Sequence, residues 1–316
     1  MKPFAFVFPG QGSQSVGMLD AWGDHPAVGS TLDEASQALG EDVAKLIAAG
    51  PRERLDLTTN TQPAMLAAAV ACYRAWVHEG GPAPSAVAGH SLGEYSALVA
   101  AQVLTLPDAL QLVRFRAQAM QAAVPVGVGA MAAILGLDSA AVIEGCAHVA
   151  ASFGEASGEV VEAVNFNDPK QTVIAGTKAG VDAGCERLKA MGAKRALPLA
   201  VSAPFHCSLM KPAAEALRER MATVRFSAPQ VAVINNIDVA SPTAADAIRD
   251  ALYRQAFGPV RWVEVVQALR ERGLLQLVEC GPGKVLAGLV KRVDALMTGS
   301  ALFDPASLRD VKAALA

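Results

Sequence analysis

A serine between two glycines is the part of this sequence that most directly suggests chemistry. The segment Gly89-His90-Ser91-Leu92-Gly93 matches the pattern G-x-S-x-G, and it follows a short apolar run and precedes a helix-like stretch. In that context the pattern is typical of a nucleophile elbow, in which a sharp turn lifts the serine hydroxyl out of the sheet. The alternative is a glycine-rich turn capped by Ser91, but the flanking strand and helix favour a nucleophile.

A serine nucleophile needs a base, and a neutral imidazole is the usual base near neutral pH. His90 is expected to point away from Ser91 at a sharp turn, and three other histidines lie in segments typical of surface or packing positions: His25, His78 and His148. His206 follows Val201-Ser202-Ala203-Pro204-Phe205, interpreted as an apolar strand that ends in a rigid turn. Strand ends are where α/β sites assemble. By elimination we predict His206 as the base, with a structural histidine as the alternative.

An arginine on the helix predicted at about 107–123 is a candidate for binding an anion. Arg116 has apolar residues three and four positions away, whereas Arg114 has glutamines there. Arg114 is therefore predicted to face water and Arg116 to face inward. A buried arginine needs an anionic partner. The sequence favours neither of two partners for Arg116, an internal carboxylate or a substrate carboxylate held bidentately.

The composition excludes several other classes of function. The chain has 316 residues, is 52% hydrophobic and 18% charged, and carries a net charge of −3. These values are typical of a globular protein and provide no electrostatic footprint for nucleic acid or an anionic membrane. Five widely spaced cysteines predict free thiols in a reducing compartment, and the sequence holds no metal-binding pattern. No targeting segment is recognised, so we expect a cytoplasmic protein.

The elements that must position these residues alternate along the chain. Strands are expected at 4–8, 86–88, 231–234 and 274–279. Helices are expected at 61–77, 92–102, 107–123, 210–223, 243–257, 260–272 and 284–293, and a last one begins at Asp304-Pro305. This alternation predicts an α/β fold with a mostly parallel sheet and helices on both faces.

The middle of the chain has a different order of elements. Strands are expected at 128–135, 160–165, 172–175 and 196–199, with helices at 139–151 and 179–191. This β-α-β-β-α-β order is typical of a ferredoxin-like α+β unit. We therefore predict a large domain of residues 1–124 and 198–316, with a ferredoxin-like subdomain of residues 125–197 inserted into it. Ser152–Gly158 is predicted to be a flexible excursion, neutral for function.

Together these residues resemble the malonyl-CoA:acyl carrier protein transacylases over essentially the whole chain. The markers of the resemblance are Phe8–Gln14, Gly89–Glu94, Arg116, Val164–Asn167, Ala203–His206, Arg254-Gln255 and Glu279–Gly283. The resemblance implies a hydrolase-like α/β core and an acyltransferase of fatty acid biosynthesis. Such an enzyme moves malonyl from malonyl-CoA to the phosphopantetheine thiol of acyl carrier protein through a malonyl-serine, in ping-pong order, without metal or redox cofactor.

The resemblance also implies a role for each site residue. Ser91 would be the acylated nucleophile with His206 as its base, and the backbone amides of Gln11 and Leu92 would form the oxyanion hole. Arg116 would bind the malonyl carboxylate, and the backbone carbonyl of Gln255 would orient the imidazole. Gln62 and Asn165 would line the pocket, and a phenylalanine at the position of Phe205 goes in the family with malonyl over bulkier methylmalonyl groups. We expect a monomer that has no nucleic-acid or membrane partner.

Two other classes of function remain as alternatives. A serine esterase or thioesterase would need an acid between Ser91 and His206, but the aspartates considered there fall in the predicted insert: Asp138, Asp168 and Asp182. A non-catalytic module that binds carrier proteins would not explain an intact set of Ser91, His206 and Arg116. The sequence does not distinguish a fatty acid, polyketide or malonate decarboxylase carrier as the acceptor.

Overall fold

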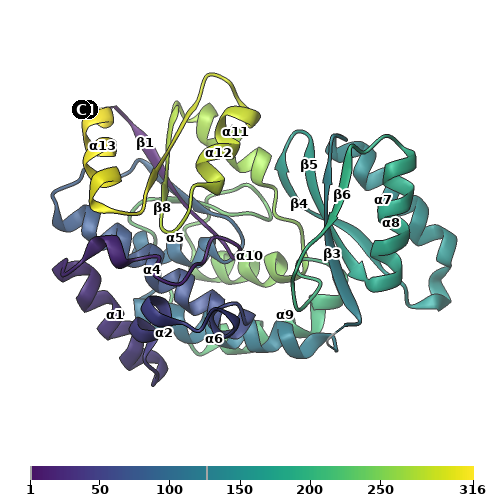
Figure 1. Cartoon of the computed structure of the whole chain (residues 1–316), viewed down its shortest axis with the longest axis horizontal. Helices are drawn as coiled ribbons and strands as arrows, with labels where there is room; N and C mark the ends of the chain where they lie inside the picture. The colour runs from purple at the N-terminus through teal and green to yellow at the C-terminus, as the bar shows by residue number, and fades with distance from the viewer. Residues whose placement is uncertain (1, 126) are drawn as a thin grey trace.

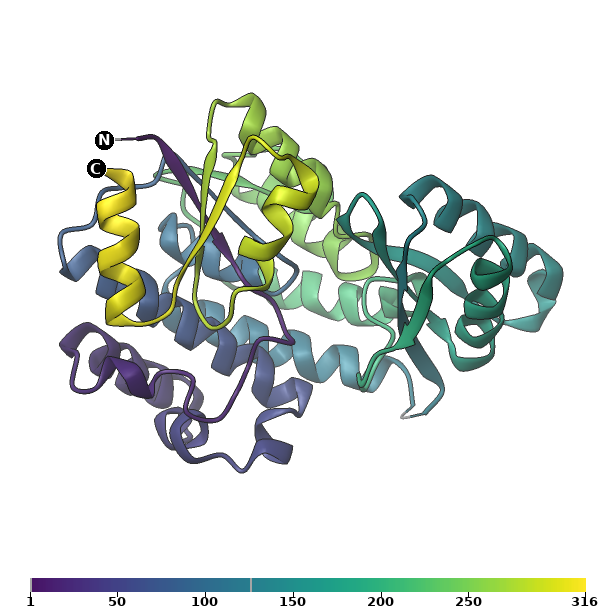
Figure 2. The ribbon, with the colours of Figure 1, turned by 45° about the horizontal axis from the view of Figure 1, so that its top comes forward.

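The chain forms two units that lie side by side, each built around its own sheet (Figure 1). This computed structural model describes residues 2–125 and 127–316. The larger unit contains both ends of the chain, and the backbone N–H of Lys2 donates to the carbonyl of Leu315 over 2.9 Å. Figure 2 shows the two termini next to each other.

Sheet A is the centre of the larger unit. Within the described residues it has five parallel strands in the order β7-β2-β1-β8-β9. The strands are β1 (Phe4–Phe8), β2 (Ala86–Gly89), β7 (Ala232–Ile234), β8 (Gln276–Cys280) and β9 (Thr298–Leu302). The predicted mostly parallel sheet is confirmed, but β9 was not predicted. Its sequence TGSAL is half-buried at the sheet edge and lacks a continuous apolar run.

Helices cover both faces of sheet A, as predicted. Phe4, Phe6 and Phe8 face one layer, whereas Ala5 and Val7 face the other. The first layer contains α1 (Pro26–Leu39), α4 (Thr58–His78), α5 (Gly93–Ala100), α6 (Leu106–Ala123), α9 (Lys211–Ala222), α10 (Ala245–Phe257) and α13 (Pro305–Leu315). The second contains α11 (Trp262–Glu271) and α12 (Val285–Val293). No helix of the described residues is long and apolar enough to cross a membrane.

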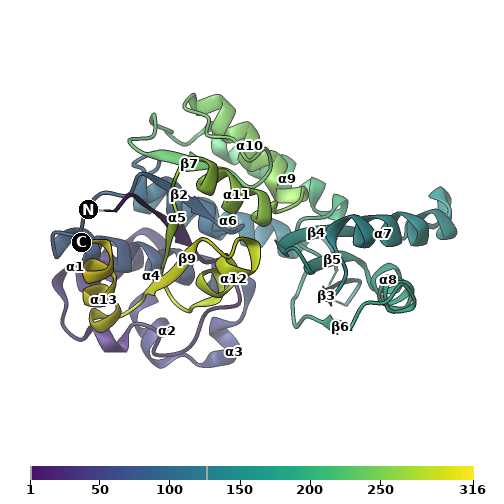
Figure 3. The ribbon, with the colours of Figure 1, turned by 90° about the horizontal axis from the view of Figure 1, so that it is seen from above.

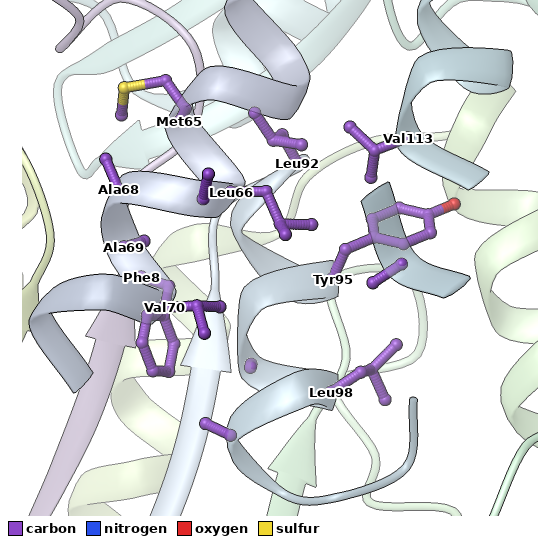
Figure 4. Packing of buried hydrophobic residues seen from close by; sticks show 14 of the residues in the cluster. Phe8, Met65, Leu66, Ala68, Ala69, Val70, Leu92, Tyr95, Leu98 and Val113 are labelled. Carbon is purple, nitrogen blue, oxygen red and sulfur yellow. The ribbon is translucent and has the colours of Figure 1, made fainter. Parts of the chain in front are cut away.

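The long helix α4 begins earlier than predicted. Thr61 was expected to cap this helix, but the helix starts at Thr58 with Leu57 as its N-cap. Thr61 therefore lies within the helix, and its hydroxyl donates to the carbonyl of Leu55 over 2.6 Å. Figure 4 shows Val70 of α4 packed against Phe8 of the central strand. This packing places the middle of α4 beside the end of β1.

Residues 20–55 form helices that the sequence analysis did not assign. They are η1 (Asp20–Trp22), α1, α2 (Val43–Ala49) and α3 (Arg52–Leu55). The start and stop signals of α1 are present in the sequence, since Pro26 is its first residue and Gly40 is its left-handed C-cap.

Sheet B is the centre of the smaller unit. Its order is β4-β5-β3-β6, and neighbouring strands of the described residues pair antiparallel. The elements are β3 (Gly129–Leu135), α7 (Ser139–Phe153), η2 (Glu155–Ser157), β4 (Val161–Asp168), β5 (Gln171–Thr177), α8 (Lys178–Ala190) and β6 (Arg195–Pro198). This order and topology are those of a ferredoxin-like unit. The predicted flexible excursion is instead the end of α7 followed by η2. The domain boundaries at 125 and 197 stay a prediction.

The two units are joined along strand β4. Val260, just before α11, donates its N–H to the carbonyl of Val164 over 2.8 Å and accepts from Phe166 over 3.0 Å. Asp168, at the end of β4, forms an ion pair of 3.3 Å with Arg292 of α12. Figure 3 shows the smaller unit at one end of the molecule, with β4 on the side that faces the larger unit. These contacts fix how the smaller unit lies against the carboxyl ends of the sheet A strands.

Candidate active site

Ser91 lies in a strained turn between β2 and α5. Its φ of 52° is in the left-handed region that non-glycine residues rarely adopt. A Cβ added to Gly89 would lie 1.9 Å from the backbone of Gly93, and one added to Gly93 would lie 2.1 Å from the carbonyl oxygen of Phe8. Strand, turn and helix approach so closely that both flanking positions require glycine.

His206 lies against the nucleophile. Its Nε2 is 2.6 Å from the Oγ of Ser91, and its Nδ1 is 2.9 Å from the backbone carbonyl oxygen of Gln255. A carbonyl can only accept, so Nδ1 carries the hydrogen in the neutral ring and Nε2 has a free lone pair. The imidazole is therefore set to take the proton of Ser91.

The imidazole of His206 is held in its neutral form. Burial, and after it the nearby charge of Arg116, lower its pKa to about 3 against the opposing effect of the Gln255 carbonyl.

The position of His206 in the fold differs from the expectation, because strand β6 ends at Pro198 and residues 199–205 are irregular. Pro204 lacks the N–H that a strand ladder needs.

Arg116 faces inward, as predicted, and its side chain reaches the nucleophile. It is 2% exposed. One Nη donates to the Oε1 of Gln62 over 2.7 Å, and the other lies 3.1 Å from the Oγ of Ser91 and 3.4 Å from the Oε1 of Gln255. No ion pair among the described residues involves Arg116, so the structure contradicts the internal salt bridge. The guanidinium beside the nucleophile has no carboxylate in direct contact, so the carboxylate of a ligand can pair with it.

The prediction for Arg114 is wrong in part. Its side chain is 22% exposed and forms an ion pair with Glu41 instead of facing water freely. Glu41 belongs to the segment between α1 and α2, which covers this face of α6. The prediction failed because the periodicity of α6 alone does not indicate that another segment of the chain covers it.

The predicted site residues meet in a cleft of about 330 Å³ at the junction of the two units. Every predicted residue except Gln255 lines the cleft: Gln11, Gln62, Ser91, Leu92, Arg116, Asn165, Phe205 and His206. Gln255 is fully buried behind His206. Among the described residues, neither the N–H of Gln11 nor that of Leu92 donates a hydrogen bond. Both amides thus remain available as oxyanion donors.

Two polar side chains, those of His90 and Asn165, form further parts of the cleft wall. His90 points away from the nucleophile, as expected, and its Nε2 lies 2.8 Å from the Oδ1 of Asn167. Asn165 presents a buried Oδ1 that has no hydrogen-bond partner among the described residues. This amide oxygen can accept a hydrogen bond from a ligand.

Sequence reasoning missed the groups that hold the elbow from behind. Asn236 accepts the N–H of Ser91 over 2.7 Å and donates to the carbonyl of Gly89 over 2.7 Å. Its own N–H donates to the carboxylate of Glu94 over 2.9 Å. Asn235 and Asn236 follow directly after β7, which pairs with β2. Two polar residues at the end of a strand were therefore the signal in the sequence that could have indicated this role.

The arrangement contradicts a serine hydrolase triad. The group that accepts from His206 Nδ1 is a carbonyl, and the aspartates considered for a triad lie on the smaller unit. Asp168 pairs with Arg292, and Lys170 and Lys178 pair with Asp138 and Asp182. A serine, a neutral histidine and a free arginine instead suit transfer of an acyl group that carries a carboxylate.

Comparisons with known proteins agree with this chemistry. The sequence matches the family described as "Acyl transferase domain" over residues 5–297. The malonyl CoA-acyl carrier protein transacylase of Escherichia coli (strain K12) is 53% identical over 309 residues, which cover 98% of each chain.

Solved structures give the same result. An acyl-carrier-protein S-malonyltransferase from Burkholderia pseudomallei 1710b is similar with a TM-score of 0.95 and 63% identity, covering 99% of this chain and 100% of that one. A malonyl-transacylase in complex with its holo type II PKS acyl-carrier protein has a TM-score of 0.95 and 50% identity, with the same coverage.

Proposed function

The chain belongs to the family of malonyl-CoA–acyl carrier protein transacylases, and on that premise we propose that Ser91, His206 and Arg116 carry out its transfer reaction. The enzyme is an [acyl-carrier-protein] S-malonyltransferase. It moves a malonyl group from malonyl-CoA to the phosphopantetheine thiol of acyl carrier protein through a malonyl-serine.

The position of Arg116 is the observation that carries the assignment of the acyl group. Its guanidinium is buried, has no carboxylate in ion-pair contact among the described residues, and lies 3.1 Å from the Oγ of Ser91. A malonyl group bound to Ser91 would place its free carboxylate within reach of that guanidinium. A neutral acyl group would leave the buried charge unpaired, which is costly.

In the first half-reaction the Oγ of Ser91 attacks the thioester carbonyl of malonyl-CoA. The Nε2 of His206 takes the hydroxyl proton, and the N–H groups of Gln11 and Leu92 donate to the oxyanion, each worth about 2.7–4 kcal/mol in the transition state. The C–S bond then breaks, and the sulfur leaves as the CoA thiol with the proton from His206. The carbonyl of Gln255 holds the imidazole in position for both proton transfers.

The second half-reaction reverses these steps with a different thiol. His206 takes the proton of the phosphopantetheine thiol, and the thiolate attacks the ester carbonyl of malonyl-Ser91. The C–O bond breaks, and the Oγ of Ser91 receives the proton from His206. The same residues thus serve the acyl donor in the first half-reaction and the acceptor in the second, as ping-pong kinetics require.

The remaining site residues are proposed to shape the acyl pocket. Gln62 holds Arg116 through its Oε1, and its Nε2 donates to the hydroxyl of Thr58 over 3.1 Å. Phe205 is half-buried at the cleft and takes up space that a methyl branch on the acyl group would need. Asn165 faces the same space with an unpartnered amide oxygen.

The acceptor and the working state of the protein complete the proposal. We assign the chain to fatty acid biosynthesis and expect a cytoplasmic monomer. We also expect no nucleic-acid or membrane partner, because the net charge of −3 provides no electrostatic attraction for either. Light scattering during size-exclusion chromatography tests the monomer. Transfer rates to purified fatty acid and polyketide carrier proteins, compared side by side, test the acceptor.

Intact-protein mass spectrometry tests the transfer mechanism. After brief incubation with malonyl-CoA, the wild type is expected to gain one malonyl group, the Ser91→Ala variant none, and the adduct should disappear when holo acyl carrier protein is added. Acetyl-CoA should label the protein far less. Steady release of free malonate without an adduct would instead indicate a hydrolase.

A further inference from the structure

A buried carboxylate lies behind the catalytic groups and takes no part in the proposed proton transfers. Glu94, in the first turn of α5, is 2% exposed. Its Oε2 accepts from the backbone N–H of Asn236 over 2.9 Å and from the Nε2 of Gln255 over 3.0 Å. A buried acid with such fixed partners is costly to retain, so its role needs an explanation.

The partners of Glu94 are the groups that hold the reactive residues in place. Asn236 accepts the N–H of Ser91 over 2.7 Å. Gln255 donates its Nε2 to the carbonyl of Ser91 over 3.1 Å, and its backbone carbonyl receives the hydrogen of His206 Nδ1. Glu94 therefore contacts both supports of the nucleophile and the base.

The amide of Gln255 also separates two opposite charges. Its Nε2 faces the carboxylate of Glu94, and its Oε1 accepts from an Nη of Arg116 over 3.4 Å. Because an amide has only one donor end, the bond to Glu94 determines that the carbonyl end faces Arg116. The guanidinium and the carboxylate are thus coupled through one neutral side chain without an ion pair between them.

We propose that Glu94 is a positioning residue of this site, which fixes Gln255 against Arg116 and balances the guanidinium charge so that the acyl carboxylate is held and then released. The inference rests on the proposed function, because it assumes that Arg116 binds the malonyl carboxylate. A transferase must release the malonyl group to the carrier protein, so a clamp that binds too tightly would slow turnover.

Charge balance explains why an acid at position 94 would weaken the clamp. In the empty site the charges of Arg116 and Glu94 offset each other through the Gln255 amide. When a malonyl carboxylate arrives, the site holds one positive and two negative charges, and the like charges repel each other in a medium of low dielectric constant. Removing the charge of Glu94 should therefore strengthen the binding of malonyl relative to acetyl.

The site itself makes this charge sensitive to pH. Burial raises the pKa of Glu94 to about 7, against the opposing effects of Gln255, Asn236 and Arg116. The other charged or titratable groups that act on it are Asp238, whose pKa is lowered by Arg254, and Tyr95, whose pKa is raised to about 12 by burial. Neither changes its charge between pH 6 and 8.

The test compares Glu94→Gln with a matched buried acid. A glutamine keeps an oxygen for both donors but removes the charge. Glu279 is 0% exposed, burial raises its pKa to about 7, and its Oε2 accepts from the N–H of Ala287 over 2.8 Å, at the start of α12. Glu279→Gln therefore controls for the loss of a buried carboxylate away from Ser91.

The quantity measured is the ratio of kcat/KM for malonyl-CoA over acetyl-CoA, in which effects common to both donors cancel. At pH 8, where the wild-type Glu94 is mostly charged, Glu94→Gln is expected to raise this ratio roughly fivefold, with a lower KM for malonyl-CoA and a lower kcat, while Glu279→Gln leaves it unchanged. An unchanged ratio in Glu94→Gln, or an equal shift in Glu279→Gln, overturns the proposal.

A measurement on the wild type keeps the proposal testable if Glu94→Gln does not fold. The malonyl-over-acetyl ratio should fall by roughly fivefold as the pH rises from 6 to 8, because Glu94 gains most of its charge over that range. A ratio that is flat with pH overturns the proposal. Failure of the proposed function is seen separately, as no malonyl adduct on Ser91 in the wild type, or as an unchanged ratio in Arg116→Ala.

Discussion

At the scale of single residues, the catalytic imidazole is oriented by a backbone carbonyl and not by an acid. The carbonyl of Gln255 fixes the tautomer of His206 but adds no negative charge next to it. Burial and the nearby charge of Arg116 lower the pKa of the ring, so it stays neutral at pH values well below the ordinary pKa of histidine. A neutral base beside a positive clamp suits a substrate that brings its own negative charge.

This environment leads to a prediction for the pH dependence of acylation. Because the pKa of His206 is lowered to about 3, the base remains unprotonated when the pH falls from 7.0 to 5.5. The single-turnover rate of malonyl-Ser91 formation, measured by quenched-flow mass spectrometry, should not decrease over that range. A decrease of about tenfold with a midpoint near 6.5, the ordinary histidine value, would contradict the assignment.

Replacing the clamp should change the choice of acyl group. Arg116→Ala removes the partner of the malonyl carboxylate, so kcat/KM for malonyl-CoA is expected to fall roughly 100-fold. Acetyl transfer should be relatively better, because acetyl has no carboxylate to leave unpaired. Parallel kinetics with both donors measure the effect, and unchanged malonyl kinetics would exclude the clamp.

Phe205 is expected to limit the width of the acyl pocket. A serine in its place opens space in the cleft for a methyl branch, so Phe205→Ser should raise the kcat/KM of methylmalonyl-CoA relative to malonyl-CoA by roughly tenfold. Competition between the two donors, followed by mass spectrometry of the acylated carrier protein, gives the ratio directly. If the ratio stays constant, another residue sets the width.

At the scale of elements, the site depends on how closely strand β2 and helix α5 approach strand β1. Gly89 and Gly93 permit this approach, and the turn between them presents Ser91 with a φ of 52°. The local sequence was sufficient to predict this turn. By contrast, the start of α4 was misplaced because the hydroxyl of Thr61 bonds to Leu55, a contact that no helix-capping pattern indicates.

A methyl group in the elbow should disrupt this approach. In Gly93→Ala the new Cβ would lie 2.1 Å from the carbonyl oxygen of Phe8 in the central strand, which cannot move aside. We expect a loss of about 3 kcal/mol or more in the free energy of unfolding, with loss of acylation.

The matched control is Gly288→Ala on α12, where an added Cβ meets nothing within 4 Å. Because alanine is the better helix former, this change should be neutral or stabilise by up to ~1 kcal/mol. Urea unfolding of the two variants and the wild type measures the difference. Equal stabilities for the two variants would show that the elbow tolerates a side chain.

At the scale of the whole molecule, the cleft exists because two units meet. The larger unit supplies Ser91 and Arg116, whereas Asn165 comes from strand β4 of the smaller unit. The irregular segment after β6 returns the chain to the larger unit and carries His206. The joint through Val164 and Val260 therefore affects the geometry of the site as well as the packing of the units.

The packing of the whole chain also determines which thiols can react. Burial raises the pKa of Cys72, Cys146 and Cys207 to about 12 and that of Cys280 well above the ordinary thiol value, whereas Cys185 is only half-buried. A disulfide reagent at pH 8 should modify Cys185 of the native protein first and reach the other thiols only in denaturant. Cys185→Ser should abolish the fast phase; a second fast-reacting thiol would contradict this packing.

The sequence alone determined the features that depend on residues near one another along the chain. The glycine-serine-glycine turn, the buried run Phe4–Phe8 and the inward face of Arg116 follow from local spacing and periodicity. The order of strands and helices then restricted the fold to a parallel sheet with an α+β insertion, because few arrangements bury such a pattern.

Only the tertiary structure decided which distant residues complete the site. Ser91 and His206 are 115 positions apart, and Gln255 reaches the carbonyl of Ser91 across 164 positions. These contacts decide whether Arg116 has a carboxylate partner and which group orients the imidazole. They also decide that Glu94 and Asn236 support the elbow. Local patterns contain no information about them, because the energy of a buried polar group depends on the partner that the fold brings to it.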